Sequence, residues 1–250
     1  MKRVWLLLCG LILLCLCACH AEQADESVPE KRLPPDRELT LEEALEYATP
    51  LATSALADEM TEDLELAKET YEGYYYLMNF VVVGNDADDD YVWSRLHAPI
   101  PTLYNKNVDF LLYLPEEERT GVEYGDVVQL VGKISFIGVS KKLNRTATMM
   151  ELTDAHLVTK TFQVTGKVTK KYTNYKGENR LILVDESDSV FPDSEIGIHW
   201  QPGGDFAVGD TVTATGTLVD HIRHDSIGGS ALHAWLFAMD ETESVELVNP

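Results

Sequence analysis

The chain has 250 residues, of which 45% are hydrophobic, 25% charged and 9% aromatic, a composition typical of a globular protein. Its 20 basic and 42 acidic side chains give a formal net charge of -22. This charge argues against general affinity for nucleic acid, which depends on neutralising phosphates, and excludes a polybasic membrane-binding surface. The composition itself indicates neither a reaction nor a ligand.

The N-terminus has the pattern of an export signal. Lys2 and Arg3 precede an apolar run over residues 4–18, which is shorter than a comfortable membrane span. The run ends in Leu-Cys-Ala-Cys at residues 16–19, which resembles the bacterial lipobox, a motif that is cleaved before a cysteine that becomes lipid-modified. We therefore predict a signal peptide over residues 1–18 and lipidation of Cys19. A plain signal peptide cleaved after Ala18 or Ala21 is the alternative.

The segment after Cys19 predicts a tether over residues 19–39, because it is polar, contains three prolines and has few large apolar side chains. The protein is thus expected to be exported and lipid-anchored to the outer face of the cytoplasmic membrane or the cell envelope. Residues 1–18 carry two basic and no acidic side chains, so their removal changes the net charge from -22 to -24. All four cysteines lie within residues 9–19, so the remainder of the chain has no disulfide or thiolate metal site.

A short helical segment is predicted next. Thr40 and Glu43 have the spacing of a capping box, and the helix should run to about Ala48 before Pro50. A second helical pattern covers Met60 to Tyr71. Aromatic and β-branched residues then predict strands over residues 74–84, 91–97 and 108–114.

The fold prediction is based on an internal sequence repeat. Residues 124–134 align with 208–218 at a constant offset of 84, and both segments begin with a Gly-Asp turn that leads into a strand. Gly132 and Gly216 predict a bulge or a sharp bend within these strands. Each copy precedes a final strand, over residues 147–158 and 231–247.

Upstream of the second copy, strands are predicted over residues 162–168, 180–184 and 196–200, which makes five in this half and five in the first. Five short strands in a partly open Greek-key barrel form an OB fold. We therefore predict a mostly β protein with tandem five-stranded OB-fold barrels preceded by a short helical segment. The first domain, with its helical lead-in, covers residues 40–160, and the second covers residues 161–250. Two unrelated sandwiches or one larger sandwich remain as alternatives.

Ala67, Tyr71 and Gly73 stand before an apolar strand in the pattern Ala-x-x-x-Tyr-x-Gly. With the Gly-Asp strand start, this pattern resembles the bacterial tRNA-anti-like OB-fold family over about residues 40–158. The resemblance implies an OB fold and often a lipoprotein signal, and it implies neither tRNA binding nor catalytic residues. Phe80 replaces the glycine usual in the first strand, which Gly166 supplies in the second half.

Two clusters contain residue types that bind metal ions. Asp86 to Asp90 begins like a calcium loop, but Tyr91 and His97 stand where an EF-hand needs Gly and Glu. His221, His224 and His233 lie with Asp220 and Asp225 near a predicted loop, without tight ligand spacing. We expect solvated loops at both places, and we predict no metal, no cofactor and no catalytic residue, since the sequence also lacks nucleophile and phosphate-loop motifs.

The candidate ligand site is the first hairpin of the second half, where basic and aromatic residues alternate within an acidic chain. OB folds bind oligonucleotides or oligosaccharides at the corresponding strands and loop. The site comprises Lys170, Lys171, Tyr172, Tyr175 and Lys176. A polar hairpin turn without ligand is the alternative. We predict a non-enzymatic extracytoplasmic binding module for a protein, glycan or peptide ligand, with an oligonucleotide as the less favoured ligand and a metal-dependent hydrolase as the third hypothesis.

Overall fold

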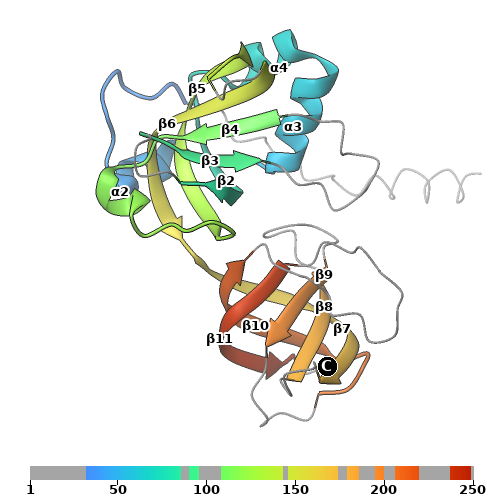
Figure 1. Ribbon diagram of the computed structural model, residues 1–250. Helices are drawn as coiled ribbons and strands as arrows, with labels where there is room; N and C mark the ends of the chain where they lie inside the picture. The colour runs from blue at the N-terminus through green and yellow to red at the C-terminus, as the bar shows by residue number, and fades with distance from the viewer. Residues whose placement is uncertain are drawn as a thin grey trace, which may run out of the picture. The chain divides into compact units, whose positions relative to one another are not determined.

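The computed structural model describes residues 32–85, 90–95, 108–142, 146–173, 179–185, 195–199, 206–219 and 237–248. Over these residues the protein is mostly β, with three short helices preceding the main strands (Figure 1). The predicted signal peptide and Cys19 lie outside the described residues.

Helix α2 (Leu41–Tyr47) begins with the predicted capping box. The Glu43 amide donates to Thr40 Oγ1 at 3.3 Å, and the Thr40 amide donates to the Glu43 carboxylate at 3.1 Å. These two bonds satisfy amides that a helix start leaves without partners. After α2, the two-residue strand β1 (Thr49–Pro50) pairs in parallel with β2 (Tyr75–Gly84).

The helical pattern predicted from Met60 to Tyr71 corresponds to two helices, α3 (Thr53–Glu62) and α4 (Leu64–Tyr71). The break falls at Asp63, whose extended backbone ends α3 and whose carboxylate accepts a hydrogen bond from the Leu66 amide at 3.0 Å. Aspartate is favoured at such an N-cap because its side chain satisfies an amide of the first turn. Among the described residues, no helix is both long and apolar enough to cross a bilayer.

The first set of strands comprises β2, β3 (Val92–Arg95), β4 (Val108–Leu112), β5 (Val127–Ser140) and β6 (Ala147–Thr159). Neighbours in the sheet follow the order β1-β2-β3-β4-β6-β5, and β5 also pairs with β2. Strands β4 and β6 are parallel, and the other pairs among these five strands are antiparallel. The short helix α5 (Glu116–Arg119) lies between β4 and β5 in the chain.

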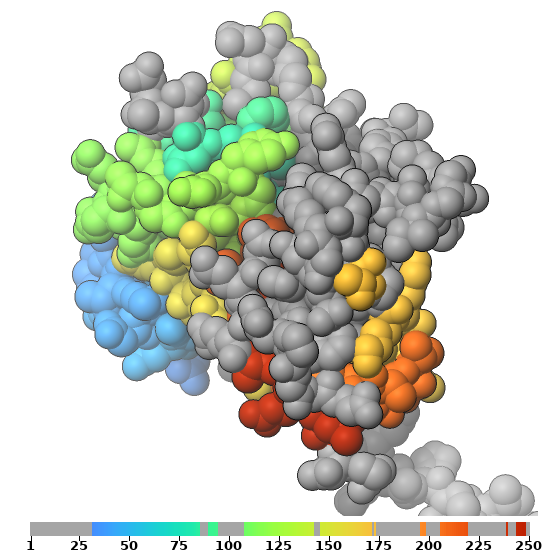
Figure 2. Space-filling view, turned by 60° about the horizontal axis from the view of Figure 1, so that its bottom comes forward, coloured from blue at the N-terminus to red at the C-terminus, as the bar shows by residue number. Residues whose placement is uncertain are grey.

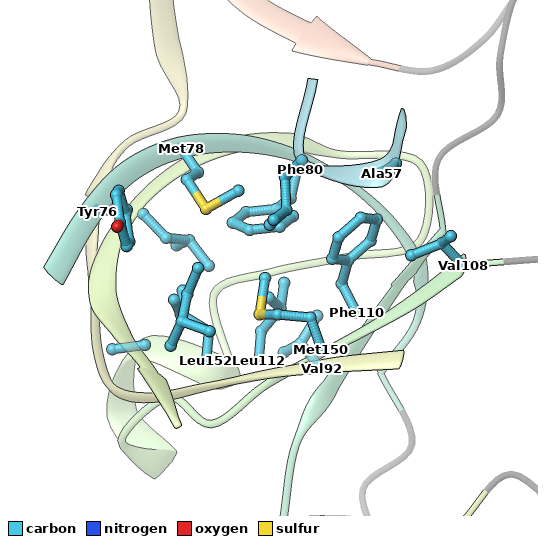
Figure 3. Close-up of a cluster of buried hydrophobic side chains, with 14 of the residues drawn as sticks. Ala57, Tyr76, Met78, Phe80, Val92, Val108, Phe110, Leu112, Met150 and Leu152 are labelled. Atoms are coloured by element: carbon cyan, nitrogen blue, oxygen red, sulfur yellow. The ribbon is translucent and has the colours of Figure 1, made fainter. Parts of the chain in front are cut away.

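Apolar side chains from these strands fill one core, to which α3 and α4 contribute Leu56, Met60 and Tyr71. Figure 3 shows the inward side chains of Met78, Phe80, Phe110, Met150 and Leu152 meeting at its centre. The rings of Phe80 and Phe110 pack edge to face with centroids 5.6 Å apart.

The second set of strands closes into a five-stranded barrel in the order β10-β11-β9-β8-β7. Its strands are β7 (Thr161–Thr173), β8 (Asn179–Asp185), β9 (Glu195–His199), β10 (Thr211–Val219) and β11 (Phe237–Leu247). Closure leaves no open sheet edge among them. Alternate residues of β7 and β10 point inward, and the buried members include Phe162, Val164, Val168, Val212, Ala214 and Leu218.

The Gly-Asp repeat forms the same turn in both places. Gly125 has φ of +91°, its amide donates to Val82 O at 2.8 Å, and the Asp126 carboxylate accepts a bond from the Glu123 amide at 2.9 Å. The turn therefore fixes the start of β5 against the end of β2.

The equivalent turn before β10 has matching bonds. Gly209 has φ of +100°, its amide donates to Val168 O at 2.8 Å, and the Asp210 carboxylate accepts a bond from the Ala207 amide at 2.7 Å. The pairing register agrees with this equivalence, because Phe80 pairs with Val128 where Gly166 pairs with Val212.

The later glycines of the repeat lie at irregular pairings, as predicted. The β5–β6 register skips Gly132, and a Cβ there would lie 2.8 Å from Leu152 Cγ. The β10–β11 register shifts beside Gly216. On β6, Asp154 has φ of +48° within the bulged region, a conformation unusual for a residue other than glycine.

Candidate functional site

The predicted ligand site lies on the β7–β8 hairpin, where the strand register changes. Val168 pairs with Leu183, but Lys170 pairs with Ile182, so Thr169 is an extra residue on β7. A bulge of this kind shifts the alternation of side chains along the strand. In a regular strand, side chains after Val168 would alternate between the two faces. Because Thr169 is an extra residue, Lys170 and Lys171 each lie on the opposite face from the one that this alternation predicts.

The position of Lys171 agrees with this shift. Its Nζ donates to the backbone oxygen of Phe206 at 3.0 Å, and Phe206 belongs to the barrel core. Figure 2 shows the gold surface of β7 bordering the orange surface of residues 206–219. The Lys171 side chain thus forms a hydrogen bond to the segment that leads into β10, in addition to any role in binding.

Lys170 is solvent-exposed and lies within the most basic part of the chain. Residues 161–184 contain five basic side chains and one acidic side chain, in a chain whose net charge is -22. Such a local reversal of charge attracts an anionic group, although the field of the whole protein opposes it. Among the predicted site residues, Lys170 has the clearest position for contacting a ligand.

Of the other three predicted site residues, only Tyr172 lies within the described ranges. Tyr172 lies in β7, where it pairs with Arg180, and Arg180 pairs in turn with His199 of β9. Tyr175 and Lys176 lie outside the described residues. The structure therefore places Lys170 and Lys171 and leaves the complete five-residue site a prediction.

Most of the metal candidates also lie outside the described residues. These are Asp86 to Asp89 of the acidic cluster and all of His221, His224, His233, Asp220 and Asp225. In the part of the chain that the structure describes, no three His, Cys, Asp or Glu side chains are grouped as metal ligands.

One polar network that the sequence did not predict holds the backbone of Leu39. The Leu39 amide donates to Asp154 Oδ2 at 3.0 Å, and Tyr75 donates its hydroxyl to the same carboxylate oxygen. His156 Nε2 lies 2.8 Å from the Leu39 oxygen, so this nitrogen is the donor, and His156 Nδ1 lies 3.4 Å from Glu118 Oε1. The network fixes the chain just before α2.

Burial and hydrogen bonds shift the pKa values of two groups in this region. Desolvation, followed by the hydrogen bond to Asp154, raises the pKa of Tyr75 above its ordinary value. At the start of α2, the hydrogen bonds from Arg37 and from the Thr40 amide lower the pKa of Glu43 to about 2. Both effects are consistent with a structural role for this region.

A second unpredicted cluster lies where strands of the first set end. Tyr91 precedes β3 and Tyr113 follows β4, and their ring centroids are 5.9 Å apart. Lys142 Nζ donates to the Tyr113 hydroxyl at 2.8 Å and lies 2.6 Å from Glu151 Oε1. Desolvation lowers the pKa of Lys142, but its bonds to Glu151 and Tyr113 raise it overall. No spacing in the sequence joins these residues, because they come from four separate segments.

No protein-family model and no curated protein matches the chain. Among solved structures, the chain is similar to the wild-type single-stranded DNA binding protein from Thermus aquaticus, with 10% sequence identity and a TM-score of 0.28. The match covers 69% of this chain and 91% of that one.

Proposed function

We propose that the protein is an exported lipoprotein that binds a ligand outside the cytoplasm and catalyses no reaction. Its anchor is lipid on Cys19, which attaches it to the outer face of the cytoplasmic membrane or the cell envelope. The observation that carries the binding role is the exposed Lys170 on a basic hairpin of a closed five-stranded barrel, within a strongly acidic chain.

The proposal includes two OB folds in tandem, divided near residues 159–161, and kinship with the tRNA-anti-like family. Support comes from the two equivalent Gly-Asp turns and from the matching pairings. In each half the third strand of the five runs parallel to the fifth, and the fourth pairs with the first. An OB fold supplies a binding surface on its second and third strands and on the loop between the first two.

The proposed ligand is an anionic glycan or peptide. Lysine ammonium groups attract carboxylates, and tyrosine rings provide flat apolar contact area together with a polar hydroxyl. Lys170, Lys171, Tyr172, Tyr175 and Lys176 are the proposed contacts. Because Lys171 also bonds to Phe206 O, its loss should lower both stability and binding. Lys170 is solvent-exposed, so its loss should lower binding with little effect on stability.

This division of roles provides the test. Binding of oligogalacturonate and of oligoglutamate to the detergent-solubilised full chain is measured by titration calorimetry. We expect Lys170→Ser to weaken binding about two- to fivefold with little change in urea unfolding, since an exposed ion pair contributes at most about 1 kcal/mol. Lys141→Ser, which removes an exposed lysine just after β5, is the matched control.

Two results would contradict the proposed site. One is the absence of binding to both polymers, and the other is equal weakening by Lys170→Ser and Lys141→Ser. A single-stranded oligonucleotide serves as the third probe, because the lysines and tyrosines also suit nucleic acid. Tighter binding of the oligonucleotide, with a steep dependence on salt, would favour the nucleic-acid alternative.

The anchor is tested separately. Cys19→Ser should release the protein from membranes or leave its signal uncleaved, because lipid attachment at a lipobox requires the cysteine thiol. Cys17→Ser should leave both processing and attachment unchanged. Membrane fractionation and intact mass measure the two outcomes, and normal processing and attachment of the Cys19 variant would exclude lipidation at this position.

A further inference from the structure

The cluster of Tyr91, Tyr113, Lys142 and Glu151 offers a different chemistry from the basic hairpin. Tyr91 and Tyr113 stand one residue beyond the Val92–Leu112 pair, so the two strand ends hold their rings together. The Tyr113 amide donates to Leu152 O at 2.9 Å, which ties this end to β6. Both tyrosines are half-buried, so backbone pairing and packing fix their positions.

Hydrogen-bonding capacity remains at this cluster. Lysine can only donate, so the Tyr113 oxygen accepts the bond from Lys142 and its own hydroxyl hydrogen remains available. Lys142 contacts Glu151 through Oε1, which leaves Oε2 as a further acceptor. Within the described ranges, neither this hydrogen nor Oε2 has a partner. The Lys142 side chain is 46% exposed, so solvent and solutes reach the site.

The charge of the cluster restricts the kind of ligand. Lys142 and Glu151 neutralise each other at 2.6 Å, so the site has no excess charge with which to select an anion. It offers one hydroxyl donor, one carboxylate acceptor and aromatic rings at fixed positions. Neighbouring hydroxyls of a sugar both donate and accept, and the C–H groups of a sugar ring pack against aromatic side chains.

We propose that Tyr91, Tyr113, Lys142 and Glu151 form a second binding site, which takes an uncharged sugar ring. The Tyr113 hydroxyl donates to a sugar oxygen, Glu151 Oε2 accepts from a sugar hydroxyl, and Tyr91 packs against the ring. The site is independent of the anionic-ligand site on β7 and β8, so Lys170→Ser should leave it unaffected.

The test measures binding of two neutral probes, cellotetraose and N-acetylchitotetraose, to the detergent-solubilised full chain. Tyr113→Phe keeps the ring and removes the hydroxyl, and we expect it to weaken binding about five- to tenfold, as loss of one hydrogen bond predicts. Tyr124→Phe removes the hydroxyl of a tyrosine that is 78% exposed in the turn before β5 and should leave binding unchanged. Urea unfolding confirms that both variants are folded.

Glu151→Gln provides a second, qualitatively different readout. It leaves the charge of Lys142 without its counter-charge, so binding of the neutral probes should weaken while binding of oligogalacturonate at this site should increase. Chemical-shift changes of the Tyr113 amide report binding at this site and distinguish it from the hairpin. No binding of either neutral probe at about 10 mM, or equal affinity of Tyr113→Phe and the native protein, would overturn the proposal.

Discussion

Gly209 adopts φ of +100°, a backbone conformation that residues with a Cβ rarely adopt. A Cβ at this position would have no atom within 4 Å, so the cost of a side chain would come from the backbone alone. We expect Gly209→Ala to lower the free energy of unfolding by about 1–2 kcal/mol, as measured by urea denaturation.

Gly121→Ala is the control for this change. Gly121 lacks a positive φ, and a Cβ there would meet Glu118 O at an ordinary 3.5 Å. The free energy of unfolding of the Gly121→Ala variant should therefore stay within about 0.5 kcal/mol of the native value. Equal loss of stability in the two variants would show that the turn conformation is not the cause.

Individual residues also show the limit of sequence-based prediction. The role of Asp126 and Asp210 in their turns was predictable, because an aspartate carboxylate accepts from an amide three residues earlier in the same chain. The extra residue at Thr169 was not, because a bulge is defined by pairing with a second strand. For the same reason the contact of Lys171 with Phe206 could not be inferred.

Among the elements, α2 contains an ionic interaction whose pH dependence has a definite sign. The pKa of Glu43 falls from 4.5 to about 2 through hydrogen bonds from Arg37 and the Thr40 amide. A carboxyl group with a lowered folded-state pKa stabilises the fold above its unfolded pKa, and this contribution is lost as the pH falls. We therefore expect the protection of amides at the start of α2 from hydrogen exchange, measured relative to the intrinsic exchange rate at each pH, to fall between about pH 4.5 and 2.

Glu43→Gln should remove most of this pH dependence. Glu42→Gln should retain it, because the two capping-box bonds join Thr40 and Glu43. Because the Arg37–Glu43 pair is exposed, 0.5 M salt should also reduce the effect. An identical exchange profile in Glu43→Gln and the native protein would assign the change to another group.

Some structural features depend on neighbouring residues in the sequence, and others depend on residues that are far apart in it. The capping box of α2 depends on four consecutive residues and was predicted correctly. The break between α3 and α4 was missed, because helical spacing of apolar residues continues on both sides of Asp63. The network around Leu39 unites residues more than one hundred positions apart, and no local pattern encodes it.

For the whole molecule, the predicted division near residues 159–161 can be tested by expressing residues 161–250 alone. All five strands of the closed barrel lie within this fragment of 90 residues, a size at which many domains fold independently. We expect a single cooperative urea transition, monitored by circular dichroism. A gradual, non-cooperative change, with a cooperative transition in the full chain, would refute independent folding.

The repeat made the overall plan of the second half accessible to sequence analysis, since alternating apolar residues and a Gly-Asp turn are local signals. The closing pairs, such as β10 with β7 and β11 with β9, join distant segments and follow only from the three-dimensional arrangement. The Tyr113–Lys142–Glu151 cluster depends on the same kind of long-range pairing in the first half.

If the proposed lipid anchor on Cys19 is present, the hydrogen bonds that hold Leu39 determine how far the folded part can lie from it. They fix the chain at this residue, so only the stretch from Cys19 to Leu39 separates a lipid on Cys19 from the fixed point. Twenty residue steps have a contour length of at most about 70 Å. If Cys19 carries the proposed lipid, a bound polymer or partner protein must come within this distance of the bilayer surface, plus the dimensions of the folded part itself. Insertions or deletions before Leu39 would change that reach by about 3.5 Å per residue without altering a contact among the strands.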